Sequence, residues 1–127
     1  MTYFCVAIGG ALGAVLRWWL GDVTPHGDGF PWTTFAINVS GCFALACLPA
    51  VPAVRQRASL AAALGPGVLG GYTTMSAYAE ETRALLADDR VLIALAYAGG
   101  TLAACLLAVL VAERVSGRAP IAPVVEP

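Results

Sequence analysis

The stretch that decides the fold is residues 67–81, which read GVLGGYTTMSAYAEE. It lies mostly inside a segment apolar enough to cross a membrane, yet two adjacent glycines are followed there by two threonines. Glycine costs a helix interior about 1 kcal/mol relative to alanine. Backbone groups freed by a helix break are tolerated at membrane depth only where protein buries them or where they line a wet cavity. The stretch therefore predicts a broken helix that holds or passes something polar.

The composition indicates that lipid surrounds much of the chain. Of its 127 residues, 59% are hydrophobic and 12% are charged, whereas a typical soluble domain carries about 25% charged residues. So few charges cannot cover a globular surface. The net charge of −1 leaves no basic excess that could displace counterions from nucleic acid, so no nucleic-acid partner is expected.

Four stretches approach the roughly 20 apolar residues that a membrane crossing requires. They are residues 2–20, 32–51, 60–79 and 91–112. The sequence therefore predicts an all-α integral membrane protein, with one domain of four transmembrane helices over residues 1–112 and a break in the third helix. Residues 113–127 are expected to form a short polar, proline-rich tail.

The membrane orientation stays open. Four crossings put both ends of the chain on one side, together with Arg55, Arg57, Arg114 and Arg118, and the opposite side holds Arg83, Arg90 and Arg17. Four against three is a weak bias for the rule that counts basic residues near span ends. Insertion in one orientation and insertion in both, as an antiparallel dimer, fit equally well.

Glycines also recur at the spacing that lets membrane helices approach closely. Gly9 is paired with Gly13, and Gly67 with Gly71. These pairs fit helix packing within one subunit at least as well as a seam between two subunits.

Polar side chains inside membrane spans are costly and usually face a partner or a cavity. Asn38 lies near the centre of the second span, where its amide could bond an anion or a neighbouring helix. Arg17, near the end of the first span, either reaches the membrane interface or offers a fixed positive charge to anions. The third span is the richest in polar groups, with Tyr72, Thr73, Thr74, Ser76 and Tyr78. Uncharged donors of this kind suit a strongly hydrated anion that must lose water without being trapped.

Residue types typical of enzymes or metal sites form no pattern here. No nucleophile–base pair is visible, and the lone His26 lies in a loop rich in glycine, proline and aspartate. The cysteines Cys5, Cys42, Cys47 and Cys105 each lie in an apolar stretch, with neither the paired spacing of zinc ligands nor a disulfide framework. We interpret them as small buried apolar residues, and we do not expect enzyme activity.

Taken together, three motifs resemble the Fluc/CrcB family of fluoride channels. They are GGALGAVLR (residues 9–17), NVSGCF (38–43) and GVLGGYTTMSAYAEE (67–81), and the resemblance covers residues 3 to about 112. It implies a fluoride-specific, multi-pass channel of the cell membrane that exports fluoride passively and so lowers its cellular concentration and toxicity. It also implies an antiparallel, dual-topology dimer.

The same resemblance implies roles for individual residues. A structural sodium ion, which is not transported, would be held by the backbone carbonyls of Gly70 and Thr73. The fluoride pathway would be lined by Asn38, Thr74, Met75, Ser76 and Tyr78, with Arg17 at the vestibule.

This sequence departs from the family pattern at one motif. The family usually carries TTFSTF, in which the ring edges of two phenylalanines face the anion, whereas this chain has TTMSAY. Tyr78 keeps an aromatic ring, but Met75 lacks the electropositive ring edge. The dimer partner is therefore either a second copy of this chain or a paralogue.

Two other functions compete with the channel. A small multidrug-resistance-type exporter would need a membrane-embedded carboxylate in the first helix, and no acidic residue precedes Asp22. A non-transporting membrane subunit would explain the glycine pairs, but it would leave Asn38 and the polar run of the third span unexplained.

Overall fold

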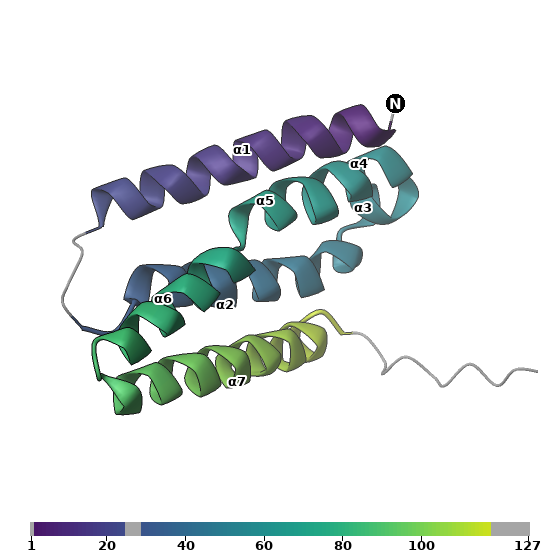
Figure 1. The fold of residues 1–127 in the computed structure, drawn as a ribbon. Coiled ribbons are helices and arrows are strands. Elements are labelled where there is room, and N and C mark those ends of the chain that lie inside the picture. The colour runs from purple at the N-terminus through teal and green to yellow at the C-terminus, as the bar shows by residue number, and fades with distance from the viewer. Residues whose placement is uncertain (1, 25–28, 118–127) are drawn as a thin grey trace, which may run out of the picture.

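The computed structural model describes residues 2–24 and 29–117, so His26 and residues 118–127 of the expected tail lie outside the described residues. All regular secondary structure in the described residues is helical, which confirms the all-α prediction (Figure 1). The elements are α1 (Thr2–Val23), α2 (Trp32–Cys47), η1 (Leu48–Ala50), α3 (Pro52–Gln56), α4 (Ala58–Ala62), η2 (Ala63–Leu69), α5 (Gly70–Tyr72), α6 (Met75–Ala87) and α7 (Val91–Val115).

Three helical stretches are long and apolar enough to cross a membrane. They are Thr2–Val23, Trp32–Ala50 and Val91–Val115. Large apolar side chains of α1 and α7, such as Leu12 and Leu92, are exposed, and this surface is suited to lipid rather than water. The described chain begins and ends at the same end of the bundle (Figure 1).

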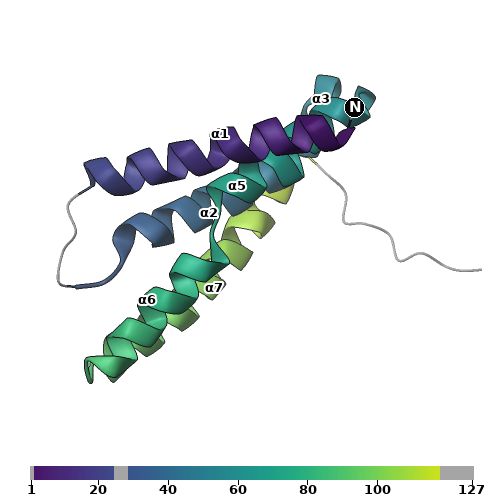
Figure 2. The same ribbon diagram turned by 45° about the horizontal axis from the view of Figure 1, so that its top comes forward.

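The segment between α3 and α7 is not one continuous helix. Pro66 lies inside η2, a run of π-helical turns. Proline lacks the N–H that an α-helical turn needs and clashes with the preceding turn, and wider π turns are one way in which a helix absorbs such a defect. Helix α5 then ends at Tyr72, Thr73 and Thr74 are extended, and α6 begins at Met75. Figure 2 shows α6 running in a different direction from α5.

The glycine pairs of the sequence pack α1 against η2 and α5 within one chain. A Cβ atom added to Gly9 would collide with the carbonyl oxygen of Ala63, and one added to Gly71 would collide with the carbonyl group of Gly10. The backbones therefore approach as closely as small residues allow, which is the packing mode typical of membrane helices.

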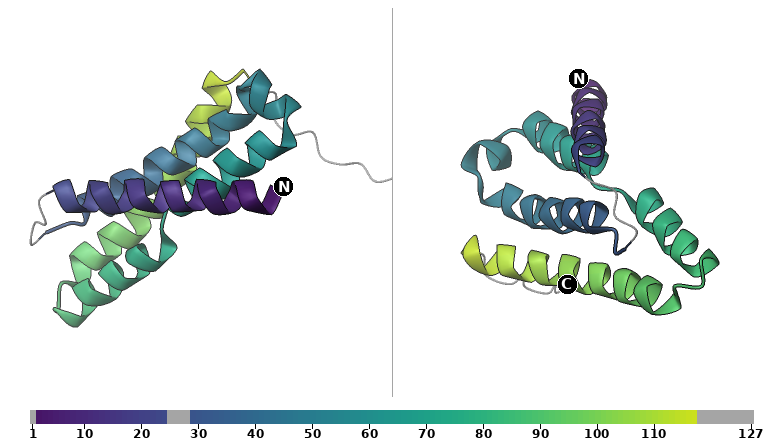
Figure 3. Two further views of the ribbon diagram at one scale, coloured as in Figure 1. Left: turned by 90° about the horizontal axis from the view of Figure 1, so that it is seen from above. Right: turned by 90° about the vertical axis from the view of Figure 1, so that its left-hand side faces the viewer.

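The core lies where α7 packs against α2 and α6 (Figure 3). Tyr97 of α7 is fully buried there. Its ring centroid lies 5.3 Å from that of Phe30, edge to face, and 5.4 Å from that of Tyr78. These aromatic contacts fix the position of α7 relative to the polar residues of α6.

Candidate functional site

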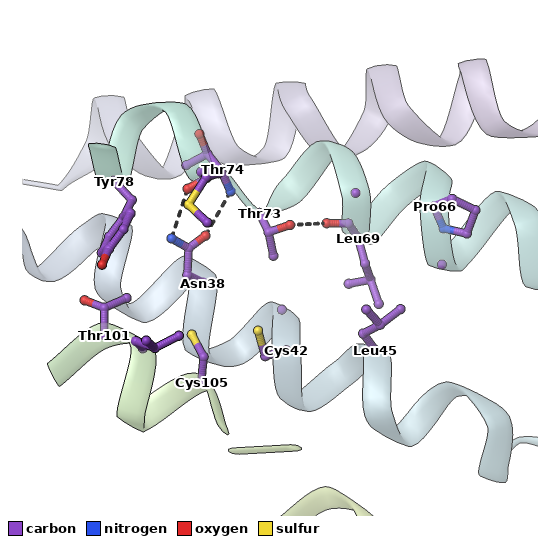
Figure 4. Close-up of a pocket in the computed structure, with 15 residues that line it drawn as sticks. Asn38, Cys42, Leu45, Pro66, Leu69, Thr73, Thr74, Tyr78, Thr101 and Cys105 are labelled. Carbon is purple, nitrogen blue, oxygen red and sulfur yellow. Dashed lines mark hydrogen bonds between the residues drawn. The ribbon is translucent and has the colours of Figure 1, made fainter. Parts of the chain in front are cut away.

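A groove of about 700 Å³ opens between α2, the η2–α5 segment, the start of α6 and α7 (Figure 4). Its polar lining comes from Asn38, Thr73, Thr74, Tyr78 and Thr101. Gly70 and Met75 also line it, so six of the eight sequence-predicted site residues lie in one groove. Ser76 and Arg17 do not line it.

Asn38 is bonded to the chain at the interruption between α5 and α6. Its Nδ2 donates to the carbonyl oxygen of Thr74 at 3.0 Å, and its Oδ1 accepts from the Thr74 N–H at 2.9 Å (Figure 4). Thr74 is buried. Because its backbone is extended, its N–H and carbonyl groups cannot form the hydrogen bonds of a continuous helix. The amide of Asn38 therefore supplies the partners that the backbone lost there.

Thr73 follows the last residue of α5, and Thr74 is the N-cap residue of α6. The Thr73 hydroxyl donates to the Leu69 carbonyl oxygen at 2.9 Å, which is a second bond to a carbonyl that also accepts from the Thr73 N–H at 3.0 Å. The Thr74 Oγ1 accepts from the Ala77 N–H at 3.1 Å, which is the usual bond of an N-cap threonine. The Ser76 hydroxyl lies 3.2 Å from the same Thr74 oxygen. Ser76 thus contacts the site through Thr74, although it does not line the groove.

Tyr78 and Met75 differ in how firmly they are held. The Tyr78 hydroxyl donates to the Ala98 carbonyl oxygen of α7 at 2.9 Å, so its ring is fixed between α6 and α7. Met75 also lines the groove, and it is 76% exposed.

Arg17 lies on the other side of Thr74, in a second groove of about 310 Å³. Its Nε donates to the Gly71 carbonyl oxygen at 3.2 Å, which links α1 to α5. This second groove is lined by Arg17, Trp18, Gly21, Asp22, Thr33, Thr34, Ile37, Thr74 and Ala77. Thr74 lines both grooves and therefore separates them.

Glu81 is a member of this region that sequence reasoning missed. Its carboxylate accepts hydrogen bonds from the Thr34 hydroxyl at 2.7 Å and from the Tyr97 hydroxyl at 2.6 Å. The available pattern was that Glu81 follows Tyr78 by three residues and Thr34 precedes Asn38 by four, so each pair shares a helix face. Glu80 instead pairs only with Arg83, its neighbour on the exposed face.

The hydroxyl of Thr101 stands out in the structure. The side chain is 3% exposed, it lines the first groove, and its Oγ1 has no hydrogen-bond partner among the described residues. A buried hydroxyl without a partner is costly, so its presence in a groove needs an explanation.

Acidic, histidine and cysteine side chains do not build a metal centre in the described part of the chain. No group of three or more such residues that could hold a metal ion occurs there. A cation in this region would therefore depend on backbone or hydroxyl oxygens.

These features define a multi-pass helical membrane protein, with uncharged polar groups gathered where the helical segment between α3 and α7 is interrupted. The family described as CrcB-like protein, Camphor Resistance (CrcB), matches residues 4–113. The chain belongs to this family.

Curated relatives match along most of their length. A protein of Nocardia farcinica named Fluoride-specific ion channel FluC 2 is 43% identical over 112 residues, covering 83% of this chain and 77% of the relative. A Streptomyces coelicolor protein named Fluoride-specific ion channel FluC 1 is 44% identical over 114 residues, covering 84% and 71%. A Paracoccus denitrificans protein named Fluoride-specific ion channel FluC is 40% identical over 113 residues, covering 86% and 89%.

Proposed function

We propose that this protein is a fluoride-specific ion channel, which lets fluoride leave the cell down its electrochemical gradient. The observation that carries the proposal is the gathering of Asn38, Tyr78 and Thr101 in one groove beside the interrupted helix. Similarity to proteins named fluoride-specific ion channels identifies the ion. No observation favours the exporter, because the only carboxylate of α1 is Asp22 in its last turn.

Uncharged donors suit this task. Fluoride is small and strongly hydrated, so a pathway must replace its water with hydrogen-bond donors but must not hold it with a buried positive charge. The Thr101 hydroxyl is a buried donor without a partner among the described residues. Asn38 gives one Nδ2 hydrogen to Thr74, and a side-chain amide carries a second one.

Arg17 and the second groove are proposed as the vestibule. A fixed guanidinium raises the local concentration of anions, and the hydroxyls of Thr33 and Thr34 line the same groove. Thr74 lies between the vestibule and the first groove, and the hydroxyl of Ser76 contacts it. In the proposed pathway, fluoride passes from Arg17 along these hydroxyls towards Tyr78 and Met75.

A second copy is proposed to complete the site. The first groove is open and mostly apolar, and Met75 is left largely exposed in it, which is unfavourable unless something apolar covers the face. We propose that α4 to α6 together make the third of four crossings and that two copies, or this chain and a paralogue, assemble as an antiparallel, dual-topology dimer across this face.

A structural sodium ion is proposed at the same face. Gly70 begins α5, Thr73 follows its last residue, and both line the groove. The extended Thr73 frees its carbonyl from the helical pattern. Carbonyls of unwound membrane helices are established sodium ligands, and none of the described residues that line the groove is a carboxylate. Two carbonyls from each copy would hold the ion between them. Replacing Na+ by N-methylglucamine during purification is expected to lower the melting temperature of the dimer, and an unchanged melting temperature contradicts this site.

The cellular role is tested in a bacterial strain that lacks its own fluoride channel. Expression of this chain is expected to restore growth in fluoride, and the Asn38→Ala variant, expressed at equal level, is expected not to. Growth that stays fluoride-sensitive with this chain, both alone and with any paralogue from the same genome, contradicts the proposal.

A further inference from the structure

Two cysteines of the first groove lie where α2 and α7 pack against each other. Cys42 of α2 and Cys105 of α7 both line the groove (Figure 4), and both are free and partly exposed. Figure 4 shows the two labelled side chains next to each other where these helices meet. The other two cysteines lie apart from them, Cys5 on α1 and Cys47 at the end of α2, where Cys47 accepts a hydrogen bond from Ser116.

Two neighbouring thiols and no further ligand favour a particular class of cation. Thiolate sulfur is a soft donor and selects soft metal ions. Zinc requires four ligands in a structural site, and the described residues offer no third His, Cys, Asp or Glu at this place. Soft ions that accept two-coordinate, nearly linear geometry, such as Hg2+, Ag+ and Cu+, need only the pair.

We propose that Cys42 and Cys105 form a two-thiolate binding site for soft, thiophilic metal ions, which bridges α2 and α7 inside the groove. Binding forms two metal–sulfur bonds and releases the two thiol protons to water, so no oxidant or reductant takes part. A bridging ion is expected to cross-link α2 and α7 at this place.

The site also has a consequence that rests on the proposed function. Cys105 follows Thr101 by one helical turn, and Cys42 follows Asn38 by one turn, so each cysteine lies next to a proposed donor of the fluoride pathway. A metal ion between the thiols is therefore expected to slow fluoride flux by narrowing the groove and by changing the relative position of α2 and α7.

Mercury binding to the full chain in detergent tests the site without any fluoride measurement. In a background with Cys5→Ser and Cys47→Ser, the chain is expected to bind one Hg2+ and to lose both free thiols. The matched controls are the same background with Cys42→Ser or with Cys105→Ser. Because two linked ligands hold an ion more tightly than one, removing mercury from the pair is expected to need roughly a hundredfold more competing monothiol than removing it from either control.

A second measurement does not depend on any variant. In the natural chain treated with one equivalent of Hg2+ and then with a maleimide, peptide mapping is expected to show Cys42 and Cys105 protected and Cys5 and Cys47 labelled. Any one of three results would overturn the site. They are binding of two Hg2+ ions per chain, removal of mercury from the pair and from the controls at the same monothiol concentration, and maleimide labelling of all four cysteines.

Flux measurements separate the two proposals. Hg2+ is expected to slow fluoride efflux in the natural chain, and a dithiol is expected to reverse the effect. If mercury binds at the pair and fluoride efflux does not fall, only the expected inhibition of fluoride flux is contradicted. Mercury bound at the pair in a protein that never conducts fluoride contradicts the proposed function and leaves the metal site standing.

Discussion

Asn38 and Thr74 are joined by two hydrogen bonds, in which the side-chain amide of one residue pairs with both backbone groups of the other, at 2.9 and 3.0 Å. This pairing anchors the interrupted segment to α2 at the point where the segment has no helical bonds of its own. The same amide faces the groove. Asn38 therefore has a structural role and a proposed conducting role, and experiments on it must measure both.

Replacing Asn38 is expected to affect stability and conduction together. Asn38→Ala leaves the N–H and the carbonyl of buried Thr74 without their partners, at a cost of about 1–3 kcal/mol, and removes a proposed fluoride donor. We expect a lower melting temperature in detergent and strongly reduced fluoride efflux, with the dimer still formed. The control is Ser40→Ala, because exposed Ser40 bonds only its own turn and the Tyr72 hydroxyl. Asn38→Ala protein with the natural melting temperature and efflux contradicts this role.

The ring of Tyr78 is expected to matter more than its hydroxyl. The hydroxyl is already engaged with the Ala98 carbonyl oxygen, so Tyr78→Phe keeps the ring in place and loses one hydrogen bond, worth about 1 kcal/mol. Tyr78→Ile removes the ring edge. Fluoride efflux is expected to fall severalfold at most in Tyr78→Phe and to be nearly lost in Tyr78→Ile, with assembly intact in both. Equal efflux from the two variants argues against a role for the ring.

Glu81 is expected to be more important for stability than its neighbour Glu80. Glu81→Ala leaves the hydroxyl of fully buried Tyr97 without its acceptor, which costs about 1–3 kcal/mol. Glu80→Ala removes only an exposed pair with Arg83, and such pairs contribute little. Thermal unfolding in detergent should show a clear loss for Glu81→Ala and almost none for Glu80→Ala. The reverse order would mean that the bonds of Glu81 are not formed in the membrane protein.

Any side chain at position 71 is expected to disrupt the close packing of α1 against α5. A Cβ atom there collides with the backbone of Gly10, and overpacking of this kind costs about 1–3 kcal/mol. Gly71→Ala should therefore lower the melting temperature and loosen the bond between Arg17 and the Gly71 carbonyl. Gly21→Ala is the control, since nothing lies within 4 Å of a Cβ atom at that position. Equal melting temperatures for both variants would contradict the packing.

Local sequence indicated where the polar groups gather but not what they bind. Glycines and threonines in residues 67–81 pointed to a weak helix, because helix propensity and membrane depth act on neighbouring residues. The pairing of Glu81 with Thr34 and Tyr97 depends on the register of three helices, which no local pattern fixes. The placement of Cys42 and Cys105 in one groove also depends on helix register, and the sequence alone predicted only small buried apolar residues at these positions. Helix α7 ends at Val115, past the expected boundary, and the residues just before this end, Ala112, Glu113 and Arg114, are good helix formers.

The packing of the glycine pairs could not be decided from sequence either. A spacing of four residues brings small residues to one helix face, but the identity of the facing helix is a tertiary property. In the structure that helix belongs to the same chain. The open groove, and not the glycine pairs, therefore indicates a second copy.

The most direct test of the account is fluoride efflux, followed with a fluoride electrode, from proteoliposomes that contain only this polypeptide, with chloride efflux as the matched comparison. The account predicts fast release of fluoride and none of chloride, with release lost in Asn38→Ala. If release requires a co-reconstituted paralogue, the channel is a heterodimer. Vesicles that stay tight to fluoride with this chain, both alone and with every paralogue, contradict the account.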